Sequence, residues 1–227
     1  QVCFEALKRG DIDLYIDYTG TVYGDTLKYE PITDIEKVYN TVKSDLDSKY
    51  NIEVLDQMGF NNTYTLAVKQ ETANLYNLKT MSDLSRVSSN LVISPSLEFI
   101  NREDGLDRVS SVYGYNFKDI IGIDGSPRYT ALINNESDVV DAFATDGLLK
   151  KFNLVVLEDD KNAFPPYYAI PLVRSDTLKE YPEIEEVLSS LGSKLNNDIM
   201  SELNYRVDEL GENPRDVARE YLDSVDF

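Results

Sequence analysis

Short runs of β-branched and aliphatic residues alternate along this chain with longer segments whose apolar residues recur at helical spacing. In the predicted helix over residues 33–49, Ile35, Val38, Val42 and Leu46 share one face. Strands separated by helices are typical of an α/β fold with parallel strands. The short runs predict strands at residues 14–16, 52–55, 63–69, 91–93, 138–143, 154–157 and 167–172. Further helices are predicted at residues 1–9, 105–113 and 128–134, and almost continuously from residue 175 onward.

The chain is long enough for two lobes but contains no flexible linker or internal repeat. Its 227 residues suit one large domain or two lobes of about a hundred residues each. Without a linker, the chain would pass between lobes through strands. We therefore predict crossovers at residues 63–69 and 166–172, with residues 1–62 and 173–227 in one lobe and residues 70–165 in the other. Prolines at both ends of the second crossover favour an edge or crossover strand over a central one.

The charge balance excludes several classes of function. The chain carries 22 Lys plus Arg against 41 Asp plus Glu, so its formal net charge is −19. Proteins that bind nucleic acid gain much of their affinity from Lys and Arg at phosphates, so nucleic acid is not an expected partner. The chain also has no histidine, which removes Ser-His-Asp triads, Cys-His dyads and His-ligated zinc.

Motifs for common chemistries are missing as well. The sequence contains neither G-x-G-x-x-G nor G-x-x-x-x-G-K-S/T, the two glycine-rich loop motifs that bind phosphate groups. Neighbouring acids such as Asp159 and Asp160 do not share a face, so they do not form a general acid and base pair. The single cysteine, Cys3, is expected to lie in the core, because free cysteines are usually buried. We therefore expect no enzyme activity, no cofactor and no metal site.

Five blocks of sequence, taken in order, resemble those of one family. They are ALKRGDIDLYIDYTGT at 6–21, NNTYTLAV at 61–68, EFINREDG at 98–105, DVVDAFATDG at 138–147 and FPPY at 164–167. Together they resemble the extracytoplasmic binding proteins of glycine betaine, carnitine and choline importers of the ATP-binding-cassette (ABC) class. The resemblance implies a two-lobed periplasmic-binding-protein fold of type II, the Venus flytrap. Family members have a further strand and helix upstream, so the resemblance predicts that the first lobe lacks them here.

The resemblance also implies capture of a quaternary ammonium compound such as choline, glycine betaine or carnitine. Such a cation has no N–H to donate, so aromatic faces hold it, each contributing about 0.5–2 kcal/mol. The matched blocks place an aromatic residue at four loops or strand ends: Tyr18, Tyr64, Phe143 and Tyr167. We expect these rings to form an aromatic cage between the lobes that closes around the ligand by hinge motion. Phe143 stands where family members often have tyrosine, and it keeps the apolar ring.

A zwitterionic ligand also needs partners for its carboxylate. Two interpretations of Arg102 stay open: its guanidinium grips the carboxylate through two hydrogen bonds, or it forms a surface salt bridge to Glu98 or Glu103. By resemblance, Thr21 and Asn62 are expected to donate further hydrogen bonds to the ligand.

The family's setting supplies the expected partners and two rival hypotheses. The resemblance implies a monomeric extracytoplasmic domain, tethered to the cell membrane by a lipid anchor or by fusion to its permease. The protein partner is then the ABC permease that receives the ligand. An effector-sensing domain of a transcription regulator can share the two-lobed fold, but it needs a helix-turn-helix. A small-molecule enzyme on a similar fold needs a nucleophile or a cofactor site.

Overall fold

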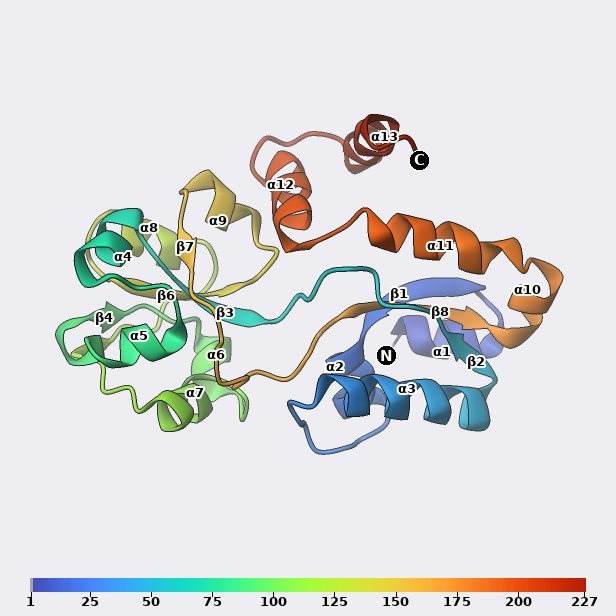
Figure 1. Cartoon of the computed structure of the whole chain (residues 1–227), viewed down its shortest axis with the longest axis horizontal. Helices are drawn as coiled ribbons and strands as arrows, with labels where there is room; N and C mark the ends of the chain where they lie inside the picture. Colours follow the sequence, from blue (N-terminus) through green and yellow to red (C-terminus); the bar gives the residue numbers. More distant parts are fainter. Residues whose placement is uncertain (1) are drawn as a thin grey trace. The chain divides into compact units, whose positions relative to one another are not determined.

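The computed structural model describes residues 2–227, which form two compact units (Figure 1). Unit 1 comprises the described residues up to Thr63 together with Pro165–Met200 and Ala218–Phe227. Unit 2 comprises Tyr64–Phe164 and Ser201–Val217. Each unit has its own sheet and its own buried cores, so the predicted α/β class is confirmed.

Unit 1 is built on a three-stranded antiparallel sheet. Its strands are β1 (Leu14–Tyr18), β8 (Ala169–Arg174) and β2 (Ile52–Val54), in that order across the sheet. Ile170 and Leu172 point to one face, where they are buried against α1 (Val2–Arg9) and α3 (Ile35–Tyr50). Ala169 points to the other face, beside α11 (Glu183–Ser193), and Figure 1 shows α3 and α11 on opposite sides of the sheet. The smaller elements are α2 (Thr19–Thr21), the π-helix η1 (Val22–Thr26) and α10 (Ser175–Glu180).

Helix α3 follows the periodicity seen in the sequence. The Asp34 side chain accepts a hydrogen bond from the Lys37 N–H at 3.0 Å, which caps the first turn. The helix ends at Asn51, whose left-handed backbone (φ 54°) stops the helical repeat. The buried face carries Val38, Val42 and Leu46, as predicted.

Unit 2 is built on a five-stranded mixed sheet. The strand order is β5 (Asp119–Ile120), β4 (Val92–Ile93), β6 (Val139–Phe143), β3 (Tyr64–Val68) and β7 (Val155–Val156). One face, which carries Tyr64 and Leu66, packs against α4 (Gln70–Tyr76), α5 (Met81–Ser85), α6 (Leu97–Asn101) and α7 (Leu106–Tyr113). The other face, which carries Ala67 and Val140, packs against α8 (Pro127–Ile133) and α9 (Gly147–Lys151). The short 3₁₀ helix η2 spans Ser88–Asn90.

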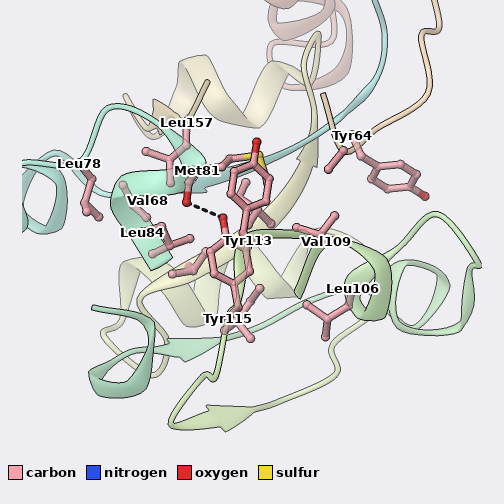
Figure 2. Close-up of a cluster of buried hydrophobic side chains, with 14 of the residues drawn as sticks. Tyr64, Val68, Leu78, Met81, Leu84, Leu106, Val109, Tyr113, Tyr115 and Leu157 are labelled. Carbon is pink, nitrogen blue, oxygen red and sulfur yellow. Dashed lines mark hydrogen bonds between the residues drawn. The ribbon is translucent and has the colours of Figure 1, made fainter. Parts of the chain in front are cut away.

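Figure 2 shows the first of these two cores, which is rich in tyrosine. The Tyr115 hydroxyl donates to the Met81 carbonyl at 2.9 Å, the bond drawn as a dashed line. The ring of Tyr115 stacks on that of Tyr113 with centroids 5.5 Å apart. Tyr115 therefore keeps a hydrogen-bond partner while its ring fills the core.

The expectation of parallel strands is wrong for most of the chain. The pairings of β3 with β6 and β7 and of β8 with β1 and β2 are antiparallel, whereas β4 pairs with β5 and β6 in parallel. The position predicted for the proline-flanked strand is wrong too, because β8 is central in its sheet. The Pro171 carbonyl accepts from the Leu55 N–H at 3.1 Å, just past the last residue of β2. The N–H that proline lacks therefore faces the place where β2 has ended, and no ladder bond is lost.

The division of the chain also differs from the predicted lobes. The predicted crossover 63–69 is largely strand β3 inside unit 2, and residues 201–217 belong to unit 2 rather than to the first lobe. The second difference arises because α12 (Asn197–Asp208) binds the turn after β6. There the Ser201 Oγ donates to the Asp146 carbonyl at 2.9 Å, and the Asn204 amide donates to the Thr145 carbonyl at 2.8 Å. Helix α13 (Pro214–Ser224) likewise has residues in both units.

Cys3 is exposed, contrary to prediction, because α1 buries Phe4 and Leu7 and turns residue 3 to solvent.

Within residues 2–227, none of the helices combines the length and the apolar character that crossing a bilayer would require.

Candidate functional site

Tyr64 and Phe143 are opposite residues on the neighbouring strands β3 and β6. Their ring centroids lie 4.5 Å apart with the planes tilted by 34°. Phe99 and Phe164 complete a cluster, with ring centroids 5.1 Å and 6.2 Å from that of Tyr64. We call these four residues the unit 2 aromatic cluster. Antiparallel pairing thus brings together two of the predicted ligand residues, since opposite side chains of a pair share a face.

The hydroxyl of Tyr64 stands apart from those of the core tyrosines. Only 4% of the residue is exposed, and no group of residues 2–227 meets its hydroxyl in good hydrogen-bond geometry, although the Glu98 carboxylate is close enough to interact with it. In Figure 2 it points away from the other labelled side chains. Burial first, and then the neighbouring Glu98 carboxylate, raise the pKa of Tyr64. The hydroxyl therefore stays protonated and can donate a hydrogen bond.

Arg102 lies over the ring of Tyr64, with its guanidinium carbon 5.4 Å from the ring centroid. Its Nε and Nη2 donate to the two carboxylate oxygens of Asp104 at 2.7 Å and 2.9 Å, and its Nη1 lies 3.4 Å from Glu98. The predicted salt bridge to Glu98 is present, whereas Asp104 rather than Glu103 is the closer partner. Asp104 is buried, so this two-point contact holds the guanidinium plane in place.

A buried carboxylate on β6 holds the helix that leads into Arg102. Asp141 is 1% exposed and accepts hydrogen bonds from the Ser96 N–H at 2.7 Å and the Ser96 Oγ at 2.9 Å. Ser96 caps α6, and Arg102 ends that helix. The Arg128 guanidinium lies 3.4 Å from the same carboxylate. Burial raises the pKa of Asp141, and Arg128 opposes that rise.

The remaining predicted residues belong to unit 1, where three of them meet. Tyr18 ends β1, and its ring packs edge-on against Phe60 with centroids 6.5 Å apart. Burial raises the pKa of Tyr18, while a side-chain hydrogen bond with Asn62 acts in the opposite direction. The Asn62 N–H donates to the Tyr167 carbonyl at 2.9 Å. Thr21 is half-buried and ends α2, the helical turn directly after Tyr18.

Several residues that shape these groups were not predicted from the sequence. Phe99 and Phe164 both lie in the matched blocks, and their aromatic side chains were the sequence feature that could have identified them. The role of Asp104 was not predicted, because two adjacent acids in one block look equivalent until the turn is formed.

The whole chain matches known proteins of one class. Residues 1–224 match the family model described as the substrate-binding domain of ABC-type glycine betaine transport systems. The chain is 38% identical over 221 residues to the ergothioneine transport permease and binding protein EgtU of Helicobacter pylori, covering 97% of this chain but 39% of EgtU. It is 36% identical to the carnitine transport binding protein OpuCC of Listeria monocytogenes, covering 98% of this chain and 73% of OpuCC. A crystal structure of a glycine betaine, carnitine and choline ABC transporter protein matches with a TM-score of 0.93 and 33% identity, covering 98% of this chain and 82% of the other.

The fold and these matches define a substrate-binding protein of the two-lobed periplasmic type rather than an enzyme. More specifically, the chain belongs to the family of substrate-binding domains of ABC-type glycine betaine transport systems. The substrate-binding proteins of ABC importers are extracytoplasmic. The family thus confirms the resemblance drawn from the five blocks.

Proposed function

We propose that this chain binds a quaternary ammonium compound through the aromatic rings of both units and delivers it to an ABC permease. The observation that carries the proposal is the close pair of tilted rings, Tyr64 and Phe143, with the Arg102 guanidinium over the Tyr64 ring. That geometry supports a role in cation binding, because the negative face of an aromatic ring attracts cations and needs no N–H from the ligand. Tyr18 and Tyr167 contribute the corresponding rings of unit 1.

The relatives favour a ligand that also carries a carboxylate. EgtU, OpuCC and a Pseudomonas aeruginosa relative, 34% identical, are named for ergothioneine, carnitine and glycine betaine. Each of these compounds combines a trimethylammonium group with a carboxylate. Arg102 binds the carboxylate in this proposal, and Asn62, Thr21 and the Tyr64 hydroxyl add hydrogen bonds. Because Asp104 already holds two N–H groups of Arg102, it orients the guanidinium rather than competing for its full donor set.

The delivery step assigns the chain a membrane partner. EgtU is named as a permease and a binding protein together, which supports fusion to the permease as the way this chain is tethered; a lipid-anchored separate domain is the alternative. The domain acts as a monomer in this proposal, because one chain supplies all seven ligand residues.

Calorimetric titration with a panel of ligands tests the proposal. The panel contains choline, glycine betaine, carnitine and ergothioneine, and glycine serves as a control that lacks the methylated cation. We expect heat from at least one methylated ammonium compound and none from glycine, because only the former matches an aromatic cage. Equal binding of glycine and glycine betaine would contradict the proposal.

The same titration separates the two roles of Arg102. Arg102→Ala should weaken glycine betaine binding more than choline binding, because choline has no carboxylate to lose. Arg86→Ala, which removes an exposed partner of Asp83 in the same unit, is the matched control. Equal losses for both ligands would reject the carboxylate role and leave Arg102 as a structural salt bridge.

A further inference from the structure

The segment that carries Tyr167 is held by two other parts of unit 1. The Tyr167 N–H donates to the Asn61 side chain at 2.8 Å. On the neighbouring residues, the Thr19 Oγ donates to the Pro166 carbonyl at 3.0 Å and accepts from the Tyr168 N–H at 3.1 Å. The Thr19 N–H also donates to the Tyr168 carbonyl at 2.9 Å. The backbone on both sides of Tyr167 is therefore fixed before any ligand arrives.

The ring of Tyr167 lies against Gly20. A β-carbon built on Gly20 would stand 2.8 Å and 2.9 Å from two ring carbons of Tyr167 and 2.7 Å from the Pro166 carbonyl oxygen. All three distances are shorter than a real β-carbon tolerates, and the carbonyl belongs to the backbone that Thr19 holds. A side chain at residue 20 therefore displaces the Tyr167 ring and also strains the contact with the Pro166 carbonyl.

The backbone conformation of Gly20 does not itself require glycine, because its φ is not positive. It lies in the helical turn α2, where alanine is usually the more favourable residue. Gly24, only four residues further on, is a useful contrast, because a β-carbon there would meet nothing within 4 Å. The two glycines thus differ in whether an aromatic ring occupies the space of a β-carbon.

We propose that Gly20 is a positioning residue that sets the ring of Tyr167 against the turn after β1, in the orientation that receives the methylated cation. This inference rests on the proposed function, because it takes Tyr167 to contact the ligand. Any residue larger than glycine at position 20 displaces the ring and weakens binding, without removing a group that touches the ligand.

Nuclear magnetic resonance of the ligand-free chain tests the packing directly. The α-protons of Gly20 should change chemical shift when Tyr167→Leu removes the aromatic ring, whereas those of Gly24 should not. This measurement needs no ligand, so it does not depend on the proposed function. Unchanged Gly20 shifts in Tyr167→Leu would overturn the inference.

A double-mutant cycle in calorimetric titrations tests the positioning role, using the panel compound that the native chain binds most tightly. Gly20→Ala should weaken binding at least about fivefold, comparable to the loss of one cation–π contact. Its effect should be smaller when combined with Tyr167→Leu, because only the contact with the Pro166 carbonyl then remains, and Gly24→Ala should bind like the native chain. A merely structural role for Gly20 would instead weaken binding equally in both backgrounds, which would overturn the inference.

Two other outcomes separate this inference from the proposed function. Native affinity in Gly20→Ala, together with weak binding in Tyr167→Leu, would overturn the inference alone. Native affinity in Tyr167→Leu would overturn both the inference and the ligand role of Tyr167. Circular dichroism of each variant establishes that the comparison is made between folded chains.

Discussion

The two units bury very different numbers of polar and ionisable side chains. Among residues 2–227, unit 1 buries one polar side chain, that of Thr19. Unit 2 buries the ionisable residues Asp104, Arg128 and Asp141 and also several hydroxyl groups. In unit 1 the candidate ligand residues are fixed by backbone hydrogen bonds and a close glycine contact. In unit 2 they are fixed by ring-to-ring packing and by paired ions. Changes of charge should therefore act mainly on unit 2, and changes of shape mainly on unit 1.

The largest expected effect is the loss of a buried charge in unit 2. Asp141→Ala leaves Arg128 buried beside a missing carboxylate and removes both acceptors that hold Ser96. We expect a loss of about 3 kcal/mol in the free energy of unfolding, because Arg128 keeps only the longer 3.8 Å ion pair with Asp146 and a buried charge that loses its partner is strongly destabilising. Urea denaturation measures the loss, and hydrogen exchange should show that β6 amides lose more protection than β8 amides.

The exposed Glu136 provides the control for that experiment, since Glu136→Ala removes an acid of unit 2 without breaking a buried pair. Equal protection losses in β6 and β8 would contradict the view that the buried ions serve unit 2 locally.

In unit 1 the buried polar group that corresponds to Asp141 is the Thr19 hydroxyl. Thr19→Val keeps the shape but removes the Oγ that bridges the Pro166 carbonyl and the Tyr168 N–H. We expect a loss of about 1.5 kcal/mol, because two buried backbone groups lose a partner. Thermal unfolding measures it, with Thr41→Val in α3 as a control for the isosteric change. A loss as large as that of Asp141→Ala would remove the contrast between the units.

The smallest effect concerns acid stability and a helix cap in unit 2. Hydrogen bonds from the Thr80 and Lys79 N–H groups, and then Arg86, lower the pKa of Asp83 from 3.8 to about 2. Because the folded-state pKa is below the unfolded value, this stabilisation is present above pH 3.8 and is lost as the pH falls toward 2. Asp83→Asn should cost about 1 kcal/mol at neutral pH, allowing for solvent screening, and should flatten the stability profile over that acid range.

Asp34→Asn in α3 is the matched change in unit 1. Asparagine caps helices nearly as well as aspartate, so we expect a smaller loss there. An acid profile unchanged by Asp83→Asn would show that the Asp83 charge contributes nothing to the stability of unit 2.

Local patterns in the sequence predicted most elements, and long-range contacts account for what they missed. Helix α3 was predicted because Val38, Val42 and Leu46 repeat at helical spacing. Strand β5 was missed, because two exposed residues give no alternation to detect. The antiparallel pairing of β3 with β6, and the docking of α12 on unit 2, depend on contacts between residues far apart in the sequence.

The candidate site shows the same limit. Four aromatic positions were picked out by resemblance, and the structure pairs Tyr64 with Phe143 and links Tyr167 to Asn62. The contact between Gly20 and the Tyr167 ring joins residues 147 positions apart, so no local pattern encodes it. Asp104 rather than Glu103 binds Arg102 because the turn into Gly105 sets which of the two adjacent acids faces the guanidinium. Which of these residues contact the ligand stays a prediction.

The most direct test of the account is the affinity of Tyr64→Leu and Tyr167→Leu for the panel compound that the native chain binds most tightly. One variant lies in each unit, and the exposed Tyr181→Leu serves as the control. We predict that each of the two variants loses at least about 1 kcal/mol of binding free energy, or roughly fivefold in affinity, while the control binds like the native chain. Native affinity in both Tyr64→Leu and Tyr167→Leu would contradict the claim that aromatic rings of both units hold the cation.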